Sequence, residues 1–228
     1  DRWLAPKAFG GITRQEFVKL KELGLDKIVF DWQAFEEATD NELMGRKGFI
    51  TYLMDSLIRA SSAGLNVDVH FIPMKPNYKQ LPDIMECLEI AEVKNISILN
   101  FVPQGRGREN KNALMLNDEE LKEFSTILNK AREQFTGNVR IGIPLNGRIS
   151  HLCTAGTGKL DIKYDGTILP CPAFKEISAE TMEKYGIRLH SIYEDLERVV
   201  VPGGKRKMPL CKQIYGFHGD LTERDERE

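Results

Sequence analysis

The chain has 228 residues, of which 41% are hydrophobic and 29% are charged, and its formal net charge is −2. This composition is typical of globular proteins, and the small net charge argues against nucleic acid or an anionic membrane as a partner. No apolar run approaches the roughly 20 residues of a membrane span, and no secretory signal is present, so we expect a cytoplasmic protein. In that compartment the four cysteines favour metal or cluster ligation over disulfides.

Helix signals and short apolar strands alternate along the first two-thirds of the sequence. Thr13 with Glu16, and Asn117 with Glu120, form capping boxes, each of which predicts the start of a helix. In chain order we expect a helix after Thr13, a strand at 26–30, a helix at 47–63, a strand at 67–72, a helix at 82–93, a strand at 96–102, a helix after Asn117 and a strand at 139–143.

This alternation predicts an α/β fold with a parallel sheet and right-handed crossovers. The pattern by itself fits either a barrel or a doubly wound sheet. After Leu145 the helical periodicity stops, and glycine and proline become more frequent. We therefore place a domain boundary near 144–150.

The last third begins with a predicted β-hairpin. Leu160, Ile162 and Tyr164 alternate with polar residues, which is typical of a half-buried strand. Asp165-Gly166 is a strong signal for a tight hairpin turn. The return strand is expected at 167–169 and a short helix around 191–198.

Two cysteines flank this hairpin. Cys153 and Cys171 lie beyond the outer ends of the two strands, so the hairpin can bring them to the same end. Pro170 and Pro172 remove two backbone donors around Cys171 and stiffen it, which suits a metal ligand. Spacing alone leaves a disulfide, a zinc site and an iron–sulfur cluster open. Cys87 lies on the apolar stripe of its helix, and we expect it in the core.

The cysteine spacing resembles a known family. Cys153, twelve residues, Gly166, four residues and Cys171 are similar to the C-x(9–15)-G-x(4)-C opening of SPASM and twitch domains. Those domains bind auxiliary [4Fe–4S] clusters in radical S-adenosylmethionine (radical SAM) enzymes. The segments 188–198 and 207–214 resemble the helix that follows the hairpin and the loop that carries a later ligand.

The resemblance implies that Cys153, Cys171 and Cys211 bind one auxiliary [4Fe–4S] cluster. The fourth position would be taken by water, by substrate, or by His151 or His218. Three cysteines and one of these histidines would also suit a tetrahedral zinc ion.

The upstream region resembles the second half of the radical SAM barrel. The implied fold is a truncated (β/α) partial TIM-like barrel over 1–146, followed by a SPASM/twitch-like domain over 147–228. The segments that carry this resemblance are 11–32, 46–49, 63–72 and 101–107.

The same resemblance predicts a SAM site formed by Asp31, Arg46 and Val102. Asp31 would accept a hydrogen bond from a ribose hydroxyl, and Arg46 would pair with the SAM carboxylate. Val102 precedes the glycine-rich loop 103–107, which offers backbone amides to an adenine or an anion. The competing interpretations are a loop aspartate and a surface arginine, and His70 is expected to be a core histidine rather than a catalytic one.

The implied function is a radical SAM enzyme that modifies a peptide or protein. In that family a 5′-deoxyadenosyl radical removes a substrate hydrogen, and a flavodoxin or ferredoxin supplies electrons. The C-x3-C-x2-C and Gly-Gly-Glu motifs of the family do not occur in this sequence, so we expect the chain alone not to cleave SAM. The alternatives are a non-catalytic cluster-binding partner subunit and a zinc-stabilised module that binds a peptide.

Overall fold

The computed structural model describes residues 3–4, 12–45, 47–142, 155–156 and 160–194. The chain divides into two compact units. The first contains the described residues up to Phe101 together with 112–142, and the second contains 102–111, 155–156 and 160–194. The sequence analysis placed one boundary at residue 146, whereas the second unit also includes a segment from the middle of the chain. That the two units correspond to the predicted domains stays a prediction.

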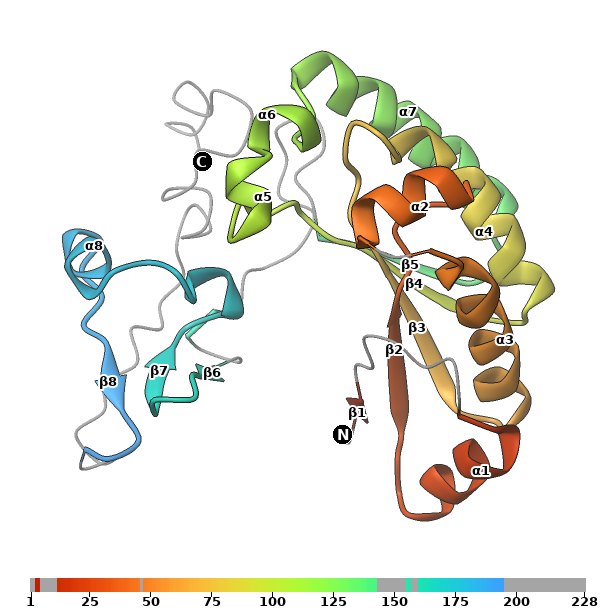
Figure 1. Ribbon diagram of the computed structural model, residues 1–228, viewed down its shortest axis with the longest axis horizontal. Helices are drawn as coiled ribbons and strands as arrows, with labels where there is room; N and C mark the ends of the chain where they lie inside the picture. The colour runs from red at the N-terminus through yellow and green to blue at the C-terminus, as the bar shows by residue number, and fades with distance from the viewer. Residues whose placement is uncertain (1–2, 5–11, 46, 143–154, 157–159, 195–228) are drawn as a thin grey trace, which may run out of the picture. The chain divides into compact units, whose positions relative to one another are not determined.

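The first unit contains a five-stranded parallel sheet whose strands follow one another in chain order (Figure 1). A doubly wound sheet reverses its strand order partway across, and this sheet does not. The predicted strands are confirmed with shifted ends, and β1 was not predicted. The strands are β1 (Trp3–Leu4), β2 (Lys27–Asp31), β3 (Asn66–Phe71), β4 (Asn95–Ile98) and β5 (Asn138–Ile141).

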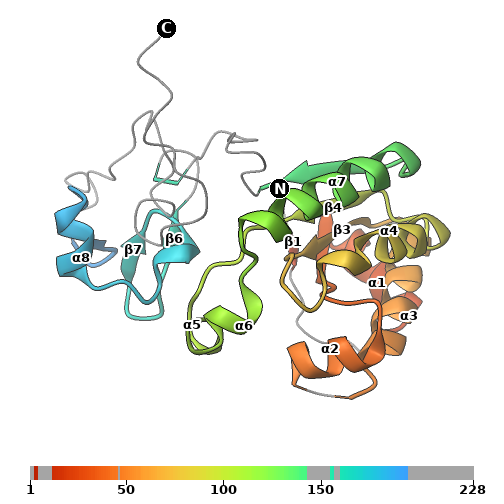
Figure 2. The same cartoon turned by 90° about the horizontal axis from the view of Figure 1, so that it is seen from above.

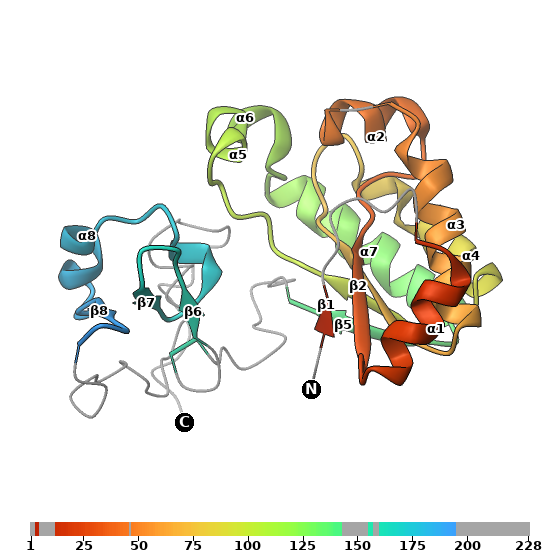
Figure 3. The same cartoon turned by 60° about the horizontal axis from the view of Figure 1, so that its bottom comes forward.

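Helices connect the strands and lie on one side of this sheet (Figures 1 and 3). In the part of the chain that the structure describes, no helix has the length and apolar character needed to cross a membrane. These helices are α1 (Arg14–Glu22), α2 (Glu37–Met44), α3 (Phe49–Ser62), η1 (Tyr78–Gln80), α4 (Leu81–Ile90) and α7 (Asp118–Gln134). Two further short helices follow β4 in the chain, α5 (Arg106–Glu109) and α6 (Lys111–Leu114), and α5 belongs to the second unit.

Both predicted capping boxes are present. The backbone N–H of Glu16 donates to Thr13 Oγ1 at 3.3 Å, and the Thr13 N–H donates to the Glu16 carboxylate at 2.7 Å. Asn117 and Glu120 exchange the same two bonds at 2.8 Å each. These reciprocal bonds satisfy orphan donors, and they explain why α1 and α7 begin where the sequence indicates.

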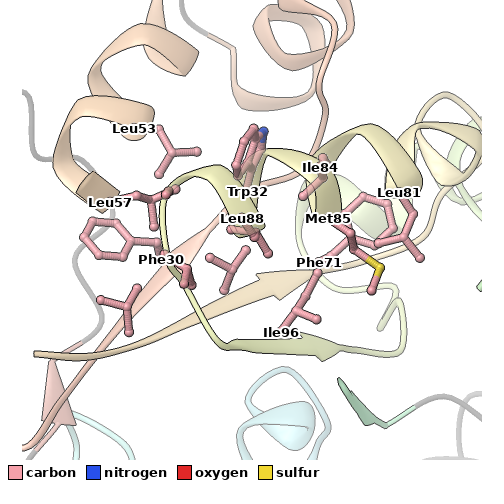
Figure 4. Close-up of a cluster of buried hydrophobic side chains, with 14 of the residues drawn as sticks. Phe30, Trp32, Leu53, Leu57, Phe71, Leu81, Ile84, Met85, Leu88 and Ile96 are labelled. Carbon is pink, nitrogen blue, oxygen red and sulfur yellow. The ribbon is translucent and has the colours of Figure 1, made fainter. Parts of the chain in front are cut away.

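The core of the first unit lies between the helices and one face of the sheet (Figure 4). Phe30, Phe71 and Ile96 project from the strands toward Leu57 of α3 and Leu88 of α4. Burying each such side chain contributes about 1.5–3 kcal/mol. The helical face of the sheet is therefore apolar, and the opposite face is left for other chemistry.

The second unit contains a small antiparallel sheet and short helical segments (Figure 2). The predicted hairpin is confirmed: β6 pairs with β7, and Gly166 occupies the turn with φ +85°. Phe174, Met182 and Ile187 form a compact apolar cluster. The elements are β6 (Asp161–Ile162), β7 (Thr167–Leu169), η3 (Pro172–Phe174), α8 (Ala179–Lys184) and β8 (His190–Ser191).

Two expectations for this unit were wrong. Leu160, Ile162 and Tyr164 are 50%, 57% and 99% exposed, because β7, with Ile168 and Leu169, supplies the buried side of the hairpin. The expected helix at 191–198 does not begin there. Its first residue belongs to β8, which pairs with β7, and a turn follows; 195–198 lie outside the described residues.

Candidate functional site

The face of the parallel sheet opposite the helices carries a row of polar side chains. Asp31, His70, Ser97 and Arg140 are register partners across β2, β3, β4 and β5. Successive strand residues point to opposite faces, so these four share a face, while their chain neighbours supply the apolar core on the other. The site is therefore built by strand register rather than by one sequence motif.

A buried carboxylate is at the centre of this face. Asp68 is 5% exposed, and its Oδ2 accepts from Lys27 Nζ at 2.6 Å. Ser97 Oγ lies 3.2 Å from both carboxylate oxygens of Asp68, and Arg140 Nε donates to the same hydroxyl at 3.1 Å. A buried carboxylate is stable only when it is paired and hydrogen-bonded, and the contacts with Lys27 and Ser97 satisfy that requirement for Asp68.

His70 lies beside Asp31, with 3.8 Å between His70 Nδ1 and Asp31 Oδ1. Burial lowers the pKa of His70 below its ordinary value, and Arg140 and Lys27 act in the same direction. Asp68 and Asp31 oppose this pKa shift but do not overcome it. The imidazole is consequently neutral at pH 7. It is half-buried on the polar face, not in the apolar core where we expected it.

Asn77 fixes the backbone beyond the carboxyl ends of β2 and β3. Its side chain is fully buried and donates to the carbonyls of Gln33 at 2.6 Å and Ile72 at 3.0 Å. The Met74 N–H donates to its Oδ1 at 2.6 Å. One side chain therefore holds two loops, and ligands of parallel α/β sheets bind at this edge.

The side chain of Gln80 also fixes the backbone that follows β2. Its Oε1 accepts from the backbone N–H groups of Phe35 at 2.8 Å and Glu36 at 3.0 Å. The sequence analysis did not identify Asn77 or Gln80. Asn77 follows a proline in a loop, and asparagine in turns tends to bond to the backbone, so that signal could have suggested it.

The predicted SAM contacts fall in different parts of the chain. Asp31 is the last residue of β2, and its side chain is 45% exposed. Val102 belongs to the second unit, where it is half-buried and its carbonyl accepts from the Gln104 N–H at 2.9 Å. Arg46 lies outside the described residues. The role of all three in SAM binding stays a prediction.

The glycine-rich loop after Val102 contacts the segment that follows Cys171. The Gln104 side-chain amide donates to the Ala173 carbonyl, and Arg108 pairs with Glu176 at 3.4 Å. Gly105, the N-cap residue of α5, has φ +51°, a conformation that favours glycine. The loop therefore belongs structurally with the predicted cluster region.

Cys171 is the predicted cluster ligand that the structure describes. It is a free, half-buried thiol with an extended backbone, φ −165° and ψ 150°, and it precedes η3. The Gly156 N–H donates to the Pro170 carbonyl at 3.1 Å, which extends the hairpin pairing up to the residue before Cys171. Cys153, Cys211, His151 and His218 lie outside the described residues. Among the described residues, no three His, Cys, Asp or Glu side chains group as metal ligands.

Cys87 packs against the core of the first unit, as expected. Burial raises the pKa of its thiol, and Glu86 and Asp83 act in the same direction. A thiol that is harder to ionise is a poor metal ligand at neutral pH. Cys87 therefore serves as a natural control for the other cysteines.

Comparison with known proteins gives consistent sequence matches. The chain is 23% identical over 177 residues to a PqqA peptide cyclase of Bradyrhizobium diazoefficiens, covering 75% of this chain and 47% of the relative. It is 27% identical over 122 residues to an Fe-coproporphyrin III synthase of Methanosarcina barkeri, covering 54% of this chain and 30% of the relative. No family model matches the sequence. The chain thus spans less than half the length of these curated relatives.

Solved structures show the same fold. SuiB of Streptococcus suis bound to S-adenosylmethionine matches with a TM-score of 0.63 and 16% identity, over 94% of this chain and 50% of SuiB. SuiB bound to its precursor peptide SuiA matches with a TM-score of 0.58 and 14% identity, over 77% and 43%. Together with the sequence matches, this shared fold supports the resemblance to radical SAM enzymes.

Proposed function

We propose that this chain is part of a radical SAM enzyme that modifies a peptide or protein. Its first unit would form part of the wall of a partial barrel, and its second unit would be a SPASM/twitch-like domain with an auxiliary [4Fe–4S] cluster. The sequential parallel sheet supports the first assignment. Relatives named for a peptide substrate, and a structural neighbour bound to a precursor peptide, support the substrate class.

The pairing at the base of the hairpin carries the cluster assignment. The Gly156–Pro170 hydrogen bond brings the chain three residues after Cys153 next to the residue before Cys171. Three residues of chain span at most about 11 Å, so the chain length would allow Cys153 to reach a group bound at Cys171. The free thiol of Cys171, fixed between two prolines, fits a thiolate ligand.

Cys153, Cys171 and Cys211 would hold the cluster in this proposal. When bound, a cluster with an open fourth position supplies either a substrate-binding iron or a route for electrons. The chain's own contribution would be to orient and enclose this cluster. The contacts of Gln104 and Arg108 with the segment 173–176 tie the glycine-rich loop to the ligand segment.

Asp31, at the end of β2, would contact SAM together with Val102 and Arg46. The buried bonds of Asn77 and Gln80 support this assignment, because they hold the loops that follow β2 and β3 in one arrangement. A site that is fixed before the ligand arrives loses less entropy on binding.

Metal analysis of the anaerobically purified chain tests the proposal. We expect four irons and four acid-labile sulfides per chain, with a cluster absorption band. Alanine at Cys153, Cys171 or Cys211 should remove most of the iron, whereas Cys87→Ala should retain it. Stoichiometric zinc without sulfide would contradict the cluster and favour the zinc-stabilised module. Intact protein with a Cys153–Cys171 disulfide and no metal would contradict both.

A further inference from the structure

Arg140 is placed to bind an anion on the helix-free face of the sheet. It lies in β5, its side chain is exposed, and its Nε donates to Ser97 Oγ at 3.1 Å. Ser97 is 1% exposed and is itself fixed by Asp68. The guanidinium is thus held by a buried support through Nε, while its two terminal nitrogens form the edge that pairs with carboxylates.

The charges around Arg140 leave it without a counter-ion among the described residues. Lys27 and Asp68 pair with each other at 2.6 Å. His70 is neutral at pH 7, because burial lowers its pKa. Asp31 lies three strands away, which corresponds to about 14 Å at ordinary strand spacing. No ion pair to Arg140 occurs within the described parts of the chain.

We propose that Arg140 binds a carboxylate of the peptide substrate, in a bidentate contact on the polar face of the sheet. The assignment of this carboxylate to a substrate rests on the proposed function, whereas carboxylate binding by Arg140 does not. A glutamate or aspartate side chain and a free C-terminus offer the same chemistry. Arg140 would therefore act as a specificity-determining residue that selects peptides with a carboxylate at this position.

A peptide titration followed by NMR tests this site in the 228-residue protein. The probes are acetyl-Ala-Glu-Ala-amide, its glutamine counterpart, and acetyl-Ala-Ala-Ala with a free C-terminus. We expect saturable shifts of the Arg140 Nε–Hε signal with at least one carboxylate peptide and none with the glutamine peptide. The peptide that binds identifies the source of the carboxylate. Equal shifts with the glutamine peptide, or no saturation with either carboxylate peptide, would overturn the proposal.

Variants separate a direct contact from a general effect of charge. Arg140→Gln should weaken carboxylate binding at least about tenfold. The affinity of Arg140→Lys should lie between those of the parent and of Arg140→Gln, because lysine keeps the charge but not the planar fork of the guanidinium. Arg132→Gln, on the exposed side of α7, is the matched control and should bind like the parent. Unchanged affinity in the two Arg140 variants would also refute the site. No reductant is needed, so these results are independent of the iron analysis.

Discussion

The first unit buries a large apolar core that extends from Phe17 to Phe135, whereas the apolar cluster described in the second unit consists of Phe174, Met182 and Ile187 with partly buried neighbours. Small units bury too little apolar surface to be stable alone and usually need a metal, a disulfide or a partner. The comparison indicates that packing holds the first unit together. In the second, the proposed cluster would stabilise the fold as well as serve the chemistry.

The largest expected effect is the loss of the second unit when the proposed cluster is removed. Structural metal sites in small domains contribute on the order of 10 kcal/mol. We expect chelation, or Cys171→Ala, to abolish hydrogen-exchange protection at Ile168 and Leu169 while Val69 and Phe71 in β3 stay protected. Mass spectrometry of exchanged peptides would measure both regions in one sample. Full protection of β7 in metal-free protein would mean that the small apolar cluster is sufficient.

A cavity in the first unit should have the next largest effect. Leu88 of α4 is fully buried, and Leu88→Ala should reduce the free energy of unfolding by about 2–5 kcal/mol. Ile90→Ala is the control, because Ile90 lies on the same helix with 73% exposure and its loss should cost less than about 0.5 kcal/mol. Urea unfolding monitored by circular dichroism compares them. Similar losses for the two variants would contradict a core on this face of α4.

Asn77→Ala should destabilise the first unit by about 2–3 kcal/mol. It leaves two carbonyls and one N–H without their partner in a buried site. Asn129→Ala, on an exposed position of α7, should be close to neutral. The same urea experiment measures both. If Asn77→Ala unfolds like the parent, the loops beyond β2 and β3 are held by packing rather than by this side chain.

The pH dependence of His70 should have the smallest effect. Its folded-state pKa is lowered by burial, so the unfolded chain binds the proton more readily. Stability is complete above the unfolded pKa of about 6.5 and is lost as the pH falls through it, by at most about 1.4 kcal/mol per pH unit. His70→Gln should flatten this slope between pH 7.5 and 5.5 in urea titrations. An NMR pKa for His70 above 6.5 would refute the assigned environment.

Local signals predicted much of the fold. The capping boxes at Thr13 and Asn117 and the turn at Asp165-Gly166 depend on neighbouring residues alone, and the structure contains all three. The helix α2 was missed because its N-cap residue, Glu36, makes no side-chain capping bond and the helix buries only Asp40 among its residues. Six-residue α8 is too short to show a periodic pattern.

The polar face could not be predicted, because it depends on strand register. Asp68 and Ser97 sit in strands with mainly apolar residues, and they meet only when β3 and β4 align. The buried side of the hairpin was mispredicted for a related reason. Alternation shows that Ile162 and its neighbours share a face, but the rest of the unit decides whether that face is covered. The cysteine spacing, in contrast, can be read from the sequence without knowing the fold, although the cluster that this spacing suggests stays a prediction.

The sequential strand order affects how the protein is made on the ribosome. Each of the strands β2 to β5 pairs with one that has already been synthesised, so the first unit can grow in the order of translation. The second unit cannot, because Gln104 must wait for Ala173 to emerge. During that interval the nascent chain already contains all five strands of the first sheet, while the glycine-rich loop has not yet met Ala173. The loop therefore reaches its final contact only after 69 further residues have been added to the chain.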